Sequence, residues 1–98
     1  MKPPRSSFAR ALRLARIARG MSQEQFDEAS SRTYISALER GLKSPTLPKV
    51  DALSGVLGIH PLTLLALSYG SSLADVEKVL ARVGSEAKEI FGTAEMPR

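Results

Sequence analysis

Residue types that usually carry out catalysis are scarce in this chain. Among its 98 residues there is one histidine, His60, and no cysteine, so a cysteine nucleophile, a thiolate zinc site and a disulfide are excluded. His60 stands directly before Pro61, where an imidazole more commonly caps a helix than acts as a general base. Five carboxylates are expected on exposed helix faces: Asp27, Glu28, Asp51, Asp75 and Glu77. The sequence contains no glycine-rich phosphate loop and no metal-ligand spacing, so we predict no catalytic residue, no metal and no cofactor.

Positive charge gathers at the beginning of the chain. Six basic residues and no acidic ones precede Gly20: Lys2, Arg5, Arg10, Arg13, Arg16 and Arg19. The whole chain has a net charge of +4 and a pI of about 9.9, so the part after Arg19 sums to −2. A basic end on a small domain favours a polyanion as the partner, most often nucleic acid. We expect residues 1–6 to form a flexible basic arm that approaches nucleic acid, whereas Arg10, Arg13 and Arg19 either contact phosphates or form a solvated helix face.

Length and composition indicate one small folded domain. Hydrophobic residues make up 43% of the chain, and the mean hydropathy is −0.09. The longest apolar run, around Leu62 to Leu67, is far shorter than the roughly 20 residues that span a bilayer, and the N-terminus has no apolar signal-peptide core. Because a chain without cysteine suits a reducing compartment, we expect a soluble cytoplasmic protein that does not contact membranes.

The spacing of apolar residues predicts an all-α fold. Short helices are expected over residues 7–19, 23–28, 32–40, 47–57 and 61–68. The expected N-caps are Ser22, which forms a capping box with Gln25, Ser31 and Thr46. Glycines are expected to end three of the helices: Gly20, Gly41 and Gly58. The sequence therefore divides into the arm, a compact five-helix domain at 7–70, a C-terminal helix at 71–92 and a tail at 93–98.

The C-terminal helix has a regular apolar seam. Its apolar residues are spaced 3, 4, 3, 4 and 3 apart: Leu73, Val76, Leu80, Val83, Ala87 and Ile90. This is the heptad pattern of helices that pair, although Gly84 and Ala87 weaken it. Two interpretations stay open, a helix that packs back on its own domain and a helix that pairs with its copy in a dimer, and the spacing favours the second.

The expected helix at 32–40 has the composition of an element that reads DNA. Ile35 and Leu38 supply a buried face that packs on Phe26 and on apolar residues of the first helix, such as Leu12. The opposite side carries short or forked side chains that suit the base edges of a major groove. The candidates for base contact are Arg32, Thr33, Ser36 and Ala37. Arg32 can fork onto a guanine, whereas Ala37 offers an apolar contact only.

The order of these signals resembles a known family. The segments GMSQEQF and SSRTYISALERGLKSPTLPKVDALSGVLGI are similar to the Cro/cI-type (XRE) helix-turn-helix regulators, and the resemblance covers Phe8 to Leu67, about 60 of the 98 residues. One departure is that the chain is about two residues shorter between Ser22 and Tyr34, where the family commonly has a turn glycine. We expect this shorter turn to change the length of the second helix or the angle between the two helices.

The resemblance implies a lambda-repressor-like domain that binds double-stranded DNA in a sequence-specific way. It further implies a homodimeric repressor on an inverted-repeat operator, and an internal ion pair between Arg16 and Glu39. Phosphate contacts are implied for residues flanking the reading helix: Ser22, Gln23, Tyr34, Arg40, Lys43 and Ser44. For Tyr34, packing of the ring at the helix boundary is an equal alternative.

A different class of function is compatible with the same sequence. An antitoxin-like protein would use the helix-turn-helix to regulate its own operon and a second surface to hold a toxin. The apolar run from Leu62 to Leu67 and the C-terminal helix are the candidate surfaces for such a partner.

Overall fold

The computed structural model describes residues 7–26 and 30–94, and within these ranges the chain forms helices and turns without strands. The elements are α1 (Phe8–Ala18), the 3-10 helix η1 (Gln23–Phe26), α2 (Arg32–Glu39), α3 (Leu47–Leu57), α4 (Pro61–Tyr69) and α5 (Leu73–Ala94). The predicted all-α fold is confirmed. The arm at 1–6, the turn residues 27–29 and the tail residues 95–98 lie outside the described residues.

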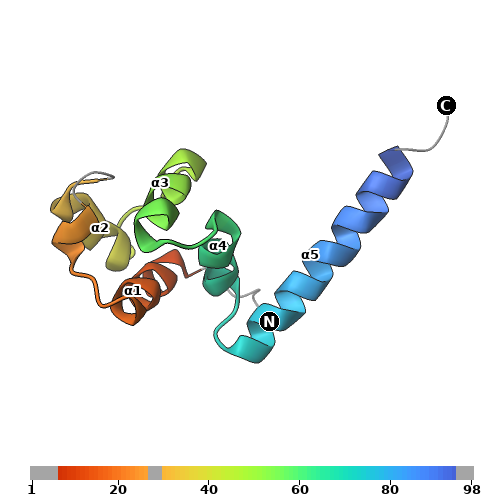
Figure 1. Cartoon of the computed structure of the whole chain (residues 1–98), viewed down its shortest axis with the longest axis horizontal. Helices are drawn as coiled ribbons and strands as arrows, with labels where there is room; N and C mark the ends of the chain where they lie inside the picture. Colours follow the sequence, from red (N-terminus) through yellow and green to blue (C-terminus); the bar gives the residue numbers. More distant parts are fainter. Residues whose placement is uncertain (1–6, 27–29, 95–98) are drawn as a thin grey trace.

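One core joins the elements from α1 to α4, and α5 projects away from them (Figure 1). Six large or medium apolar side chains in this core are fully buried: Leu12, Phe26, Ile35, Leu38, Leu53 and Leu64. They come from α1, η1, α2, α3 and α4, so every element of the body contributes at least one anchor. Burial of each such side chain contributes about 1.5–3 kcal/mol, and α2 is held through Ile35 and Leu38.

Helix ends follow the chemistry of their sequence signals. The Ser31 Oγ accepts a hydrogen bond from the N–H of Tyr34 at 3.1 Å, which caps α2. The imidazole Nδ1 of His60 accepts from the N–H of Leu62 at 3.0 Å, so this histidine caps α4. Gly58 ends α3 with a φ of 70°, in the left-handed region that favours glycine.

The second expected helix differs in type from the prediction. The sequence predicts an α-helix over residues 23–28, whereas Gln23–Phe26 form a 3-10 helix, and residues 27–29 lie outside the described residues. The backbone N–H of Gln25 donates to the carbonyl of Ser22 at 3.2 Å, and the N–H of Ser30 donates to the carbonyl of Phe26 at 2.8 Å. The tight turn brings the Phe26 ring into the core within four residues, as the short connection to α2 requires.

The C-terminal helix runs to Ala94, two residues beyond the predicted boundary. Packing back along its own domain is ruled out for most of its length. Val76 is half-buried against the body, whereas Leu80 is 50% exposed and Ile90 is 66% exposed. Most of the apolar seam therefore faces solvent in the single chain.

The most apolar helices, α3 and α4, form the centre of the core rather than a membrane span. Leu53 of α3 and Leu64 of α4 are fully buried. In the described part of the chain no single helix is long and apolar enough to cross a bilayer. Only α3 and α4 taken together meet those criteria, and the pair is bent by 106°.

Candidate nucleic-acid interface

The buried side of α2 is broader than the sequence suggests. Ile35 and Leu38 are fully buried, and Ala37 is 7% exposed. Ala37, predicted to contact a base, therefore presents little surface to a duplex in the free chain. The buried side of α2 thus extends past the stripe of Ile35 and Leu38.

The opposite side of α2 is polar and open. Arg32, Thr33, Ser36 and Arg40 line one shallow concave surface together with Gln23 of η1, and we call these five residues the α2 face. Arg32, Thr33 and Arg40 are exposed, and Ser36 is half-buried. The spacing of four residues from 32 to 36 to 40 places these side chains in one row along the helix. Arg40, expected to contact a phosphate, thus shares a surface with the predicted base readers.

The Arg32 guanidinium at the head of this row is loosely held. Its Nη1 lies 3.7 Å from Oε1 of Glu24, and both side chains are about two-thirds exposed, at 66% and 68%. Ion pairs of this kind contribute little, because water screens them. Arg32 is therefore able to leave Glu24 and to donate two hydrogen bonds to the O6 and N7 atoms of a guanine.

A buried ion pair fixes α2 from behind. Arg16 of α1 donates to both carboxylate oxygens of Glu39, with Nε to Oε2 at 2.6 Å and Nη2 to Oε1 at 2.9 Å. The Glu39 side chain is 5% exposed and the Arg16 side chain 15%. The hydrogen bond with Glu39 raises the pKa of Arg16 above its ordinary value, so the guanidinium stays charged. The two residues that the family resemblance pairs do meet.

Gln23 belongs partly to this network. Its Nε2 donates to Oε1 of Glu39 at 3.1 Å, and Nη1 of Arg16 donates to the carbonyl of Met21 at 2.9 Å. The side chains of Arg16, Glu39 and Gln23 therefore tie α1, η1 and α2 into one unit. Gln23 is both an internal contact and a member of the α2 face, so it is held in place for whatever binds there.

Two lysines lie beside α2 over one aromatic ring. Nζ of Lys43 is 5.8 Å and Nζ of Lys49 is 5.2 Å from the centroid of the Tyr34 ring. Tyr34 is half-buried and packs against the core, so its ring serves as a platform for both cations. The prediction named Lys43 and missed Lys49. The signal for Lys49 was the Thr46 cap, which places it in the first turn of α3, next to the loop that carries Lys43.

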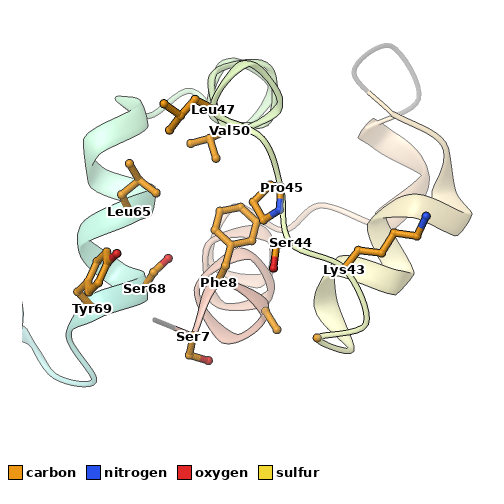
Figure 2. Close-up of a pocket in the computed structure, with 12 residues that line it drawn as sticks. Ser7, Phe8, Lys43, Ser44, Pro45, Leu47, Val50, Leu65, Ser68 and Tyr69 are labelled. Atoms are coloured by element: carbon orange, nitrogen blue, oxygen red, sulfur yellow. The ribbon is translucent and has the colours of Figure 1, made fainter. Parts of the chain in front are cut away.

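Two serines predicted to contact phosphates are placed differently. Ser22 is exposed at the start of η1, but its backbone N–H already donates to Oε1 of Gln25 at 2.6 Å. Ser44 lines a groove of about 470 Å³ between the start of α1, the loop after α2 and the end of α4. Figure 2 shows Ser44 beside Phe8 and Pro45 in this groove, with Lys43 extending away from it. The Ser44 side chain thus lies in the groove, whereas the Lys43 side chain extends away from the groove.

The described residues offer little for other chemistry. Within residues 7–26 and 30–94, no group of three or more acidic or histidine side chains is arranged to hold a metal ion. The groove in Figure 2 has apolar walls that include Phe8, Val50 and Leu65. The α2 face and the neighbouring lysines bring together polar and basic side chains from η1, α2, α3 and the loop after α2.

Comparison with known proteins gives consistent matches over this region. Residues 12–64 match a family model described as helix-turn-helix. The chain is 38% identical over 61 residues to control protein C.BamHI of Bacillus amyloliquefaciens, which covers 59% of this chain and 75% of that protein. It is also similar to the crystal structure of the hypothetical transcription factor NHTF from Neisseria, with a TM-score of 0.56, 33% identity, and coverage of 63% of this chain and 74% of that one. The family match contains η1 and α2, and with them the whole α2 face.

Proposed function

The chain belongs to the XRE-type helix-turn-helix family of DNA-binding transcription regulators, which are not enzymes, and on this premise we propose that it is a homodimeric repressor of an inverted-repeat operator. The observation that carries the proposal is the α2 face, a row of exposed polar side chains on a helix whose other side is locked to the core. Such a helix enters a major groove about 12 Å wide as a preformed reader.

Within this proposal, the first turns of α2 supply base contacts. Arg32 is exposed and held only by the loose Glu24 contact, so it donates to a guanine at small cost. Thr33 is exposed one residue further on and bonds a base edge or meets a thymine methyl. Ser36 lies one turn along the same row and reaches the next base pair. Ala37, at 7% exposure, contributes less to reading than these three residues.

Phosphate contacts come from the cations around α2. Lys43 and Lys49 lie over the Tyr34 ring. Arg40 lies at the end of the row of polar side chains along α2. Cations on either side of a reading helix neutralise backbone phosphates and set its register on the duplex, without reading sequence. Gln23 at the start of η1 completes this set, held by its bond to Glu39.

The proposed dimer uses α5. Its seam leaves Leu80, Val83 and Ile90 about half or more exposed, and an apolar stripe of this length on one helix favours a protein interface. A single domain contacts one half-site, and two copies related by two-fold symmetry gain the affinity and discrimination that a promoter requires. Occupation of a promoter by such a dimer blocks transcription, which is the basis for proposing repression.

Selection of duplexes from a random DNA library at near-physiological salt tests the proposal. We expect enrichment of an inverted repeat with half-sites about one helical turn apart. The matched control is the Arg16→Met, Glu39→Leu double variant, in which the α2 face is present but its support is removed, and we expect weaker enrichment. Salt-sensitive binding to every duplex with no enriched sequence would contradict sequence-specific regulation. It would favour the antitoxin-like alternative, in which α4 and α5 hold another protein.

A further inference from the structure

The start of α5 and the side of α4 enclose an apolar notch of about 310 Å³. Leu62, Ala66 and Leu67 of α4 form one wall, and Val76 and Leu80 of α5 form the other. Leu62 is 57% exposed and Leu80 is 50% exposed, so the notch is open to solvent. Large apolar side chains on both walls of an open hollow favour an apolar occupant.

The notch also limits how a second helix can lie on the seam of α5. Val76 belongs to the seam, yet it is half-buried and lines the notch together with residues of α4. Around Val76, α4 of the same chain therefore lies against the seam side of α5. A second α5 that ran parallel from its first turn would meet α4 there, so pairing in the same direction along the whole seam is obstructed.

The far end of α5 carries the complementary feature. Ile90 and Phe91 are each 66% exposed, and they belong to the last turns of α5, the helix that projects away from the body (Figure 1). A pair of large apolar side chains at a helix end costs free energy when water surrounds it. The chain therefore has an apolar notch at one end of α5 and an unpartnered apolar end at the other.

We propose that α5 pairs with α5 of a second copy in the antiparallel direction, so that Ile90 and Phe91 of each copy fill the notch of the other. The inference rests on the proposed homodimer and specifies its geometry. An alignment that sets Ile90 opposite Leu80 also sets Val83 opposite Ala87 and has its centre near residue 85. Two-fold symmetry then fills both notches at once, and each copy uses the same surface.

Residues near the centre of that alignment fit a close crossing. A Cβ added at Gly84 would meet no heavy atom within 4 Å, so its side of the helix is open for the approach of another backbone. Glu86, which lies beside the seam at this level, is already balanced by Arg82, with Oε2 and Nε 3.2 Å apart. The glycine that weakens a parallel seam thus lies where an antiparallel pair comes closest.

The length of α5 sets how far apart the two bodies lie. A helix of 22 residues is about 33 Å long at a rise of 1.5 Å per residue. Antiparallel pairing centred near residue 85 places the two joints between α4 and α5 about 36 Å apart along the helix axis, because Leu73 lies 12 residues from that centre in each copy. Parallel pairing would place the joints only about 8–10 Å apart.

Disulfide trapping in the 98-residue chain tests the direction of pairing, because this sequence has no cysteine. Leu80→Cys and Ile90→Cys are made in chains that carry different tags, and the two chains are mixed and mildly oxidised. Ser85→Cys, on the helix side opposite the seam, is the matched control. We expect the disulfide between position 80 of one copy and position 90 of the other to predominate. Disulfides that join two copies at the same position, 80 to 80 or 90 to 90, should not form, and the control should remain uncross-linked. The exposed positions Glu77 and Phe91, each changed to Cys, give the same discrimination if one of the first substitutions weakens the dimer.

Three results would overturn the inference, and they separate it from the proposed function. Same-position disulfides as the main products would mean parallel pairing, with the homodimer intact. A wild-type dimer in sedimentation with no disulfide from any seam position would place the interface on another surface. A wild-type chain that sediments as a monomer, alone and on operator DNA, would contradict the homodimer itself.

Discussion

Arg16 and Glu39 are 23 positions apart in sequence, yet the guanidinium of one holds both carboxylate oxygens of the other at 2.6 and 2.9 Å. This contact joins α1 to the last residue of α2, and Gln23 adds η1 to it. The polar face of α2 therefore rests on a charged support that is itself almost hidden from water. The orientation of the reading helix depends on this pair as well as on apolar packing.

Removal of one partner of this pair should be costly. Glu39→Gln leaves the Arg16 guanidinium, 15% exposed, without a counter-charge, and we expect a loss of ~2–3 kcal/mol in the free energy of unfolding. The Arg16→Met, Glu39→Leu double variant removes both charges and should recover part of that loss in urea unfolding at a fixed protein concentration. Equal losses in the single and double variants would show that the pair does not act as a unit.

The lysines on the Tyr34 ring should contribute affinity without sequence preference. We expect Lys43→Ala and Lys49→Ala each to weaken binding of all duplexes about equally and to reduce the slope of log affinity against log salt by about 1. Lys88→Ala, on the exposed part of α5, is the control and should leave the slope unchanged. Fluorescence anisotropy at several salt concentrations measures these slopes. Unchanged slopes in both variants would remove the lysine pair from the interface.

The joint between α4 and α5 should not tolerate a side chain at Gly70. A Cβ built there lies 2.8 Å from the backbone N and 2.9 Å from Cγ2 of Val76. We expect Gly70→Ala to lower the melting temperature, since the first turn of α5 has to shift. Gly55→Ala is the matched control, because it has open space inside α3 and should stabilise the fold by about 1 kcal/mol. Thermal unfolding measures both melting temperatures. If both variants raised or both lowered the melting temperature relative to wild type, a close contact between Gly70 and Val76 would be contradicted.

Acid should weaken the start of α5 through Asp75. Its Oδ2 accepts from the Oγ of Ser71 at 2.8 Å and from the Ser71 N–H at 3.3 Å, and these bonds lower the pKa of Asp75 below its ordinary value. A lowered pKa in the folded state means stability that is present above about pH 4 and is lost as pH falls through the lowered value. Asp75→Asn should therefore show a smaller loss of stability than wild type between pH 5 and pH 2 (roughly the range in which carboxylates titrate). Parallel pH profiles would show that these hydrogen bonds do not favour the charged form.

Local signals in the sequence were sufficient for the helices and their ends. Ser31 and Thr46 cap the helices that they were predicted to cap, and Gly58 ends α3 as expected. These features depend on neighbouring residues only, so a single sequence contains the information. The polar row of Arg32, Thr33 and Ser36 was also visible in the sequence, because it follows from helical spacing.

Features that depend on contacts between distant elements could not be predicted. The burial of Ala37, on the side of α2 away from Ile35, depends on packing that the helical spacing of α2 alone does not show. The reduction of the second helix to a 3-10 turn depends on how quickly Phe26 has to reach the core. The Thr46 cap places Lys49 in the first turn of α3, but its meeting with Lys43 over the Tyr34 ring depends on how α3 packs beside α2. None of these relationships has a signature within one helix.

Binding of Arg32→Ala to a series of substituted operators shows whether α2 reads base sequence. Each base pair of the half-site is changed in turn, and the dissociation constants of wild type and variant are compared at one salt concentration. We expect wild type to lose about 1–3 kcal/mol at one or two positions and Arg32→Ala to be indifferent at those same positions. Lys43→Ala is the control and should keep the wild-type pattern with uniformly weaker binding. If Arg32→Ala discriminated among the substituted operators as wild type does, Arg32 would not be a base reader and the α2 face would not be the reading surface.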